Sequence, residues 1–131
     1  MNQNTILVID DDIDLVEILR INLENAGYTV QDAQSGDAGF KLAKKNKPNL
    51  ILLDVMMGAI DEGFQTAYQI KQDPETKDIP VVMLTAVTQQ TGFKFDPVKD
   101  EAFLPVDEFL EKPINPKKLL DVVRKHLVAS A

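Results

Sequence analysis

The sequence contains no cysteine among its 131 residues. This absence excludes a disulfide scaffold, a zinc knuckle and a thiol nucleophile. Long hydrophobic runs are also missing, because the main apolar runs are about four residues long, whereas a membrane span needs about 20. The N-terminus lacks the basic and apolar regions of a secretory signal. We therefore expect a cytoplasmic protein with no segment inserted in a membrane.

Positive charge is scarce as well. The chain has 14 Lys and Arg residues against 21 Asp and Glu residues, which gives a net charge of −7. An acidic protein repels nucleic acid and anionic lipid, so we expect neither as a direct ligand. The composition, 44% hydrophobic and 27% charged, is that of a globular protein, and the length fits one domain. We expect residues 1–131 to form a single domain with no output domain attached.

Three uninterrupted apolar runs predict strands that are buried on both faces. They are Ile6–Ile9, Leu50–Leu53 and Val81–Leu84. Apolar runs of this length that do not alternate with polar residues are typical of a parallel sheet. Two more polar segments, Tyr28–Asp32 and Asp107–Leu110, predict further strands, and the first of these suits a sheet edge.

The segments between the strands carry helical patterns with recognisable ends. The residues that mark helix ends are Gly27, Ser35, Pro48 and the pair Asn115–Pro116, and a further helix is expected over Gly63–Gln72. Strands and helices therefore alternate along the chain. This alternation predicts an α/β fold, doubly wound around a five-stranded parallel sheet.

Charged and polar residues follow the predicted strands. They are Asp10, Asp11 and Asp12 after the first strand, Asp54 after the third, Thr85 after the fourth and Lys112 after the fifth. Ligands of open parallel sheets bind beyond the carboxyl ends of the strands. Two unit charges about 4 Å apart repel by about 4 kcal/mol at an effective dielectric of about 20. An ammonium group and a hard divalent cation such as Mg²⁺ would offset this repulsion. Asp12 is more typical of a helix N-cap than of a ligand.

Four motifs in this order resemble the receiver domain of two-component response regulators, the CheY-like family. The motifs are ILVIDDD at 6–12, LILLDVMM at 50–57, VMLTA at 82–86 and EKPI at 111–114. The resemblance covers essentially the whole chain. It implies a flavodoxin-like sheet with strand order 2-1-3-4-5.

The resemblance also implies a role for each motif. Asp54 would accept a phosphoryl group from a phosphohistidine on a sensor histidine kinase or a histidine phosphotransfer protein. Asp10 and Asp11 would hold Mg²⁺ together with Asp54 and the backbone carbonyl of Met56. The protein would act in signalling rather than as an enzyme, since it would catalyse only its own phosphorylation and dephosphorylation.

Further residues are implied to sense the phosphoryl group. Thr85, Ala86 and Lys112 would bind its oxygens, and Thr85 and Phe109 would switch position to change the surface offered to a downstream protein. His126, the only histidine, is expected to be a solvated residue of the last helix. The chain would then not be a phosphohistidine donor itself.

Two loops depart from the family pattern. The loop after Met57 lacks the usual proline, and the interval from Thr85 to Lys112 is about five residues longer than in the family. We expect the fourth helix to be shortened or replaced by a loop. The phenylalanines of the 88–106 segment, Phe93, Phe95 and Phe103, form a possible partner surface.

Other readings remain open at this point. A degenerate receiver could act only as an interaction module, without phosphorylation. Asp10 and Asp12 also satisfy the Asp-x-Asp pattern of haloacid-dehalogenase-like phosphatases, as nucleophile and as acid/base. A flavin-binding module is disfavoured, because three aspartates after the first strand would repel a phosphate group.

Overall fold

The computed structural model describes residues 4–54, 62–85, 107–111 and 114–130. Its centre is a parallel sheet of five strands in the order β2-β1-β3-β4-β5, as predicted. The strands are β1 (Thr5–Ile9), β2 (Thr29–Ala33), β3 (Leu50–Asp54), β4 (Val81–Thr85) and β5 (Glu108–Glu111). The more polar β2 lies at one edge of the sheet, where the sequence places it.

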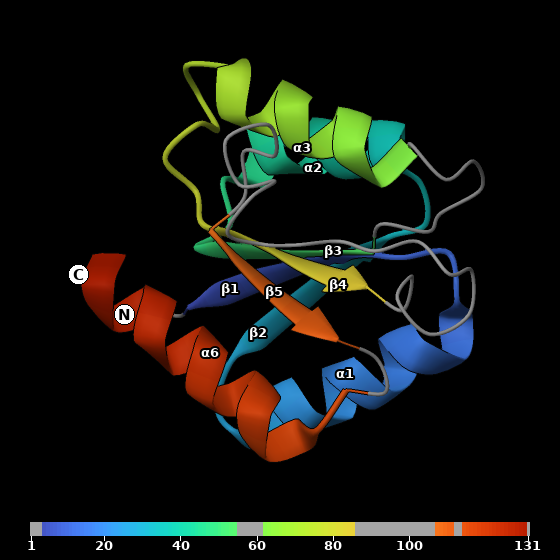
Figure 1. Ribbon diagram of the computed structural model, residues 1–131, viewed down its shortest axis with the longest axis vertical. Helices are drawn as coiled ribbons and strands as arrows, with labels where there is room; N and C mark the ends of the chain where they lie inside the picture. The colour runs from blue at the N-terminus through green and yellow to red at the C-terminus, as the bar shows by residue number, and fades with distance from the viewer. Residues whose placement is uncertain (1–3, 55–61, 86–106, 112–113, 131) are drawn as a thin grey trace.

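The described helices cover both faces of the sheet. They are α1 (Ile13–Asn25), α2 (Gly36–Asn46), α3 (Glu62–Gln72) and α6 (Pro116–Ser130). Figure 1 shows α1 and α6 below the sheet, with α2 and α3 above it. The fold is therefore the three-layered, doubly wound arrangement that the sequence predicts. The expected change in the fourth helix lies outside the described residues and stays a prediction.

The predicted helix ends are confirmed by their hydrogen bonds. The side chains of Asp12, Ser35 and Asn115 each accept hydrogen bonds of 2.9–3.2 Å from backbone N–H groups in the first turn of α1, α2 and α6. These bonds satisfy donors that a helix N-terminus otherwise leaves unpaired. After α1, Gly27 has a φ of 99°, a conformation that favours glycine.

Two hydrophobic clusters hold the layers together, one on each face of the sheet. Alternate residues of each central strand contribute to opposite clusters: Ile6 and Val8 pack toward α1 and α6, and Leu7 and Ile9 pack toward α2 and α3. Side chains of this kind contribute about 1.5–3 kcal/mol each when fully buried. Because both faces are covered, the carboxyl edge of the strands is left as the place for a polar site.

Candidate functional site

Two aspartates are brought together by the pairing of the central strands. Ile9 at the end of β1 pairs with Leu53 of β3. The next residue of each chain segment is an aspartate, Asp10 and Asp54, so the two carboxylates lie at the same level of neighbouring strands. This pairing depends on residues that are 44 positions apart along the sequence, and the parallel register supplies it.

The site is a cluster of three carboxylates. One carboxylate oxygen from each of Asp10, Asp11 and Asp54 lies within 4.8 Å of the other two. Asp10 is fully buried and Asp54 is only 2% exposed, whereas Asp11 is exposed. Burying like charges this close to one another is costly unless hydrogen bonds or a cation offset their repulsion. One such bond runs from the Asp12 backbone N–H to Asp10 Oδ1, at 2.9 Å.

Asp12 does not belong to this cluster. Its Oδ1 accepts hydrogen bonds from the backbone N–H groups of Asp14 at 3.1 Å and of Leu15 at 3.2 Å. The prediction that Asp12 caps α1 is therefore confirmed. This use of the carboxylate argues against the phosphatase reading, in which Asp12 would serve as the acid/base.

The donor set fits a magnesium ion. It offers carboxylate oxygens only, and it contains neither histidine nor cysteine. Oxygen donors of this kind suit hard cations, and Mg²⁺ is usually held by a few carboxylates while it keeps several waters. Asp11 is the exposed member of the cluster. The group could therefore hold a cation.

The ends of β4 and β5 reach the same edge of the sheet. Leu84 pairs with Asp54, so the backbone of Thr85 follows directly beside the cluster. Thr85 in turn pairs with Glu111, the last residue of β5 and the one before Lys112 in the sequence. Several predicted residues lie outside the described residues, and their roles stay predictions: Met56, Ala86, Lys112, Phe93, Phe95 and Phe103.

Phe109 lies on β5, where it pairs with Met83 of β4. Its side chain is partly buried and packs against the cluster that includes Leu7 and Ile9. It is neither a fully enclosed core residue nor a freely solvated one. An aromatic ring at the edge of the core can change its exposure without disrupting core packing. The position of Phe109 is therefore compatible with the predicted switch role, which stays a prediction.

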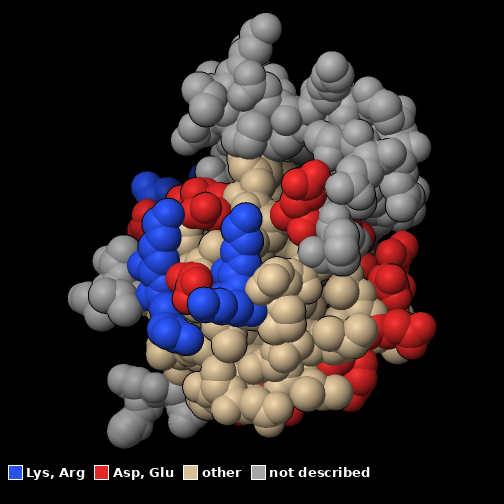
Figure 2. Space-filling model, turned by 60° about the horizontal axis from the view of Figure 1, so that its bottom comes forward, with Lys and Arg blue, Asp and Glu red and all other residues tan. Residues whose placement is uncertain are grey.

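The surface charge is uneven, which the overall charge of −7 does not reveal. Figure 2 shows Lys and Arg side chains gathered on one side of the face that carries α1 and α6, with some acidic side chains among them and further Asp and Glu side chains along its other side. The basic residues include four exposed side chains of α6, namely Lys117, Lys118, Arg124 and Lys125. Sequence reasoning missed this surface because it used the sum of the charges and not their positions around the helix.

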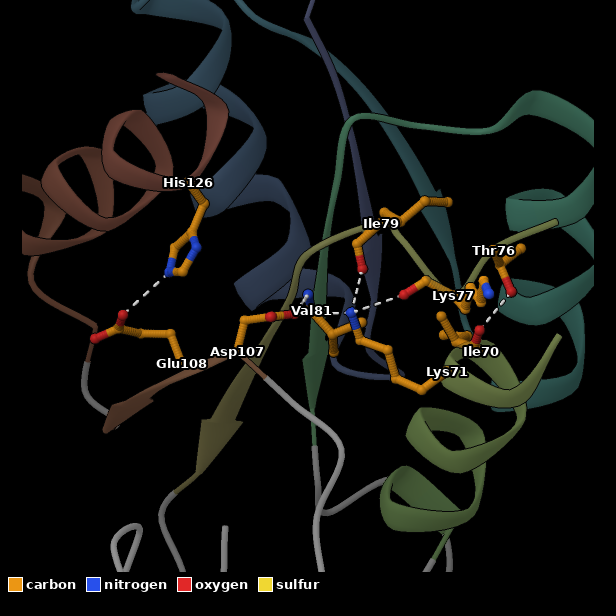
Figure 3. Close-up of polar contacts among 9 residues, drawn as sticks. All are labelled: Ile70, Lys71, Thr76, Lys77, Ile79, Val81, Asp107, Glu108 and His126. Atoms are coloured by element: carbon orange, nitrogen blue, oxygen red, sulfur yellow. Dashed lines mark hydrogen bonds and ion pairs between the residues drawn. The ribbon is translucent and has the colours of Figure 1, made fainter. Parts of the chain in front are cut away.

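The expectation for His126 is wrong. Its side chain is 15% exposed, and its Nε2 lies 3.0 Å from Glu108 Oε1 on β5 (Figure 3). Lys125 Nζ lies 3.1 Å from the same oxygen. Burial alone would raise the pKa of Glu108, but the hydrogen bonds from His126 and Lys125 outweigh it and hold that pKa below its ordinary value. His126 thus joins α6 to β5 instead of facing solvent.

A membrane-spanning segment does not occur in the described part of the chain. None of its helices is both long enough and apolar enough to cross a bilayer.

Comparison with known proteins gives consistent matches. The protein-family model of the response regulator receiver domain matches residues 6–124 of this chain. Protein PilH of Pseudomonas aeruginosa is 37% identical over 114 residues, which cover 84% of this chain and 93% of PilH. The structure of chemotaxis response regulator CheY4 of Vibrio cholerae matches with a TM-score of 0.81 and 26% identity, over 95% of this chain and 99% of that one.

Longer relatives match over only part of their length. RpaA of Synechocystis, described as a DNA-binding dual master transcriptional regulator, is 41% identical over 120 residues. The match covers 91% of this chain and 47% of RpaA. The chain therefore spans about half the length of several of the curated relatives that it matches.

Proposed function

Since this chain belongs to the family of response regulator receiver domains, we propose that it carries signals by accepting a phosphoryl group on Asp54. Proteins of this family are signalling proteins and not a family of enzymes. The observation that carries the proposal is the convergence of Asp10, Asp11 and Asp54 within 4.8 Å at the carboxyl edge of the sheet.

Within this site, Asp54 has the position of a nucleophile. Its carboxylate stands at the end of the central strand β3 and is 2% exposed, so packing restricts how it can move. In the proposed transfer, a carboxylate oxygen of Asp54 forms a bond to phosphorus while the bond between phosphorus and the imidazole nitrogen of the donor breaks. The donor protein keeps the imidazole as an unphosphorylated histidine side chain. Positioning and charge neutralisation supply most of the catalysis in such transfers.

Asp10 and Asp11 complete the acidic site. We assign them, with Asp54 and the backbone carbonyl of Met56, to the binding of Mg²⁺. When bound, Mg²⁺ neutralises negative charge on the phosphoryl oxygens. The hydrogen bond from the Asp12 backbone N–H keeps Asp10 Oδ1 in place at the start of α1, so the helix cap and the metal site share one turn of chain.

The phosphorylated state would be sensed by the neighbouring strand ends. Thr85, Ala86 and Lys112 are assigned to the phosphoryl oxygens, and Thr85 and Phe109 to the switch. The backbone of Thr85 is adjacent to the strand that carries Asp54, and Phe109 lies on the next strand at the edge of the core. A hydroxyl drawn toward the phosphoryl group would then leave room for the aromatic ring to move inward.

The partners belong to the same proposal. The phosphoryl donor would be a sensor histidine kinase or a histidine phosphotransfer protein, and the receiver of the signal would be a downstream protein. We also place the protein in the cytosol, as the sequence predicts. Direct binding of nucleic acid is not part of the proposal, since a net charge of −7 opposes it.

Phosphorylation can be tested by intact-mass measurement after incubation with acetyl phosphate and Mg²⁺. We expect the wild type to gain the mass of one phosphoryl group, Asp54→Asn to gain none, and omission of Mg²⁺ to suppress the gain. Asp12→Asn is the matched control, because asparagine also caps helices while it removes a carboxylate next to the cluster. This control should be phosphorylated like the wild type.

Two results would contradict the proposal. Equal phosphorylation of Asp54→Asn and the wild type would show that the acceptor is another residue. The phosphatase hypothesis predicts that this residue is Asp10. A wild type that folds and binds Mg²⁺ but takes up no phosphoryl group would instead indicate a receiver that works only as an interaction module.

A further inference from the structure

Asp12 connects the start of α1 to the acidic cluster. Its Oδ1 accepts hydrogen bonds from the backbone N–H groups of Asp14 at 3.1 Å and Leu15 at 3.2 Å, in the first turn of the helix. Its own backbone N–H donates a hydrogen bond of 2.9 Å to Oδ1 of Asp10. One residue therefore contacts both a helix terminus and a carboxylate of the cluster.

Asp10 is held at both its backbone and its side chain. Its backbone N–H donates a hydrogen bond of 3.0 Å to the carbonyl of Ala33 in β2, and its Oδ1 accepts the hydrogen bond from Asp12. Because Asp10 is fully buried, bulk water does not readily replace the N–H of Asp12 as a donor. The direction of the Asp10 carboxylate therefore depends on where the backbone of Asp12 lies.

The helix cap in turn fixes the backbone of Asp12. This residue is extended, with a φ of −89° and a ψ of 101°, and its carbonyl accepts a hydrogen bond of 3.0 Å from the backbone N–H of Val16. Val16 is buried in the hydrophobic cluster that joins α1 to the sheet. Without the bonds that the Asp12 side chain accepts, the first turn of α1 frays more readily. The N–H group that contacts Asp10 then loses its fixed position.

We propose that Asp12 is a positioning residue for Mg²⁺ at the acidic cluster. The inference rests on the assignment of Mg²⁺ to Asp10, Asp11 and Asp54 that is made above. Asp12 does not belong to this group of carboxylates and acts through Asp10. Hydrogen bonds that orient a metal ligand typically change metal affinity by about 10–100-fold. Such coupling is reciprocal, so bound Mg²⁺ also makes the first turn of α1 open less often.

Two other roles for the Asp12 carboxylate predict different behaviour. A direct metal ligand, or a charge that attracts the cation, would be impaired equally by asparagine and by alanine, because both substitutions remove the charge. A residue that only caps the helix would stabilise α1 and leave metal binding unchanged. A positioning residue is replaced by asparagine but not by alanine, because asparagine caps helices about as well as aspartate does.

Calorimetric titration of the full chain with magnesium chloride, without a phosphoryl donor, separates these roles. Asp12→Ala should raise the Mg²⁺ dissociation constant by about tenfold, the lower end of the range, because the backbone N–H of residue 12 is still present. Asp12→Asn should raise it by less than about twofold. Ser35→Ala is the matched control, because it removes the cap of α2, where Ser35 Oγ accepts a hydrogen bond of 3.1 Å from the Ala38 N–H. This control should bind Mg²⁺ like the wild type.

Amide hydrogen exchange of the wild type gives a second measurement, which does not depend on whether a variant folds. Saturating Mg²⁺ should slow exchange at the N–H groups of Asp14 and Leu15 by about tenfold, the factor that the cap contributes to Mg²⁺ affinity. The Ala38 N–H at the start of α2 should exchange at the same rate with and without Mg²⁺. Equal slowing at both helix starts, or no slowing in α1, would contradict the coupling.

The calorimetric outcomes that would overturn the proposal are equally specific. They are equal weakening by Asp12→Ala and Asp12→Asn, unchanged binding by Asp12→Ala, and equal weakening by Ser35→Ala. A wild type that binds no Mg²⁺ would overturn this inference together with the metal assignment. Because phosphorylation of Asp54 is measured separately, a protein that is phosphorylated there but shows no coupling would refute this inference alone. A protein that shows the coupling but takes up no phosphoryl group would refute only the phosphoacceptor proposal.

Discussion

At the scale of single residues, position 39 shows how closely the layers approach one another. Gly39 lies in α2, and a Cβ added there would come within 2.6 Å of Ile9 Cγ1 on β1. Contacts this short do not occur without a shift of one of the partners. The absence of a side chain therefore lets α2 pack directly on the strand that leads into Asp10.

Gly39→Ala is expected to destabilise the protein by about 1–3 kcal/mol, although alanine is the better helix former. The overlap with Ile9 outweighs the gain in helix propensity, which is about 1 kcal/mol. Urea unfolding followed by circular dichroism measures the change. Combining Gly39→Ala with Ile9→Val should cost less than the sum of the single changes, since the shorter side chain relieves part of the overlap. A stabilised Gly39→Ala variant would contradict this account.

At the scale of elements, one lysine joins α3 to the start of β4 and β5. Lys71 Nζ donates hydrogen bonds to the backbone carbonyls of Ile79 at 2.7 Å and Lys77 at 3.3 Å, and lies 2.9 Å from Asp107 Oδ2 (Figure 3). Asp107 Oδ2 also accepts a hydrogen bond of 2.8 Å from the Val81 backbone N–H. These contacts lie at the amino edge of the sheet, opposite the acidic cluster, and they hold the start of β5 through Asp107, two residues before Phe109.

Lys71→Met is expected to lower the free energy of unfolding by about 1–2 kcal/mol. Methionine keeps the length of the buried stem but removes the donor, which leaves polar partners around it unsatisfied. Lys77→Met is the matched control, because the Lys77 side chain is exposed and should change stability by less than about 0.5 kcal/mol. Equal effects of the two substitutions in chemical denaturation would show that the contacts of Lys71 add nothing.

At the scale of the whole molecule, ion pairs between elements couple stability to pH. Asp73 accepts a hydrogen bond from the Glu75 backbone N–H and pairs with Lys44 of α2, and both contacts hold the pKa of Asp73 below its ordinary value. The pKa of Glu108 is lowered by its contacts with α6. A carboxylate whose pKa is lower in the folded state stabilises that state above its unfolded pKa, and the contribution is lost as the pH falls through the folded pKa.

Thermal stability should therefore decline as the pH falls below about 5, the region where carboxylates with ordinary pKa values begin to take up protons. Glu108→Gln should make this decline shallower, because the variant has no carboxylate to protonate at the contact between β5 and α6. The melting temperature measured from pH 7 to pH 3 tests this expectation, and Asp78→Asn, at an exposed position, serves as the control. An identical pH profile for Glu108→Gln and the wild type would count against the role of this pair.

Much of the fold follows from local features of the sequence. Buried runs such as Leu50–Asp54 reveal strands because both faces of a parallel sheet are apolar. Caps such as Asp12 and Ser35 reveal where helices begin because they satisfy backbone donors within one turn. The position of β2 at the sheet edge and the meeting of Asp10 with Asp54 also follow, since the carboxyl ends of parallel strands share one edge.

By itself, the sequence determined the order of elements, the ends of the helices and the acidic cluster, because each depends on periodicity or on the direction of a strand. Only the tertiary structure decided that His126 is partly buried against Glu108, that Lys71 joins α3 to the start of β5, and that exposed basic side chains gather along α6. Those features depend on how far apart two surfaces lie after packing. These distances depend on the combined volumes of many side chains packed between the elements. No local sequence pattern contains that information.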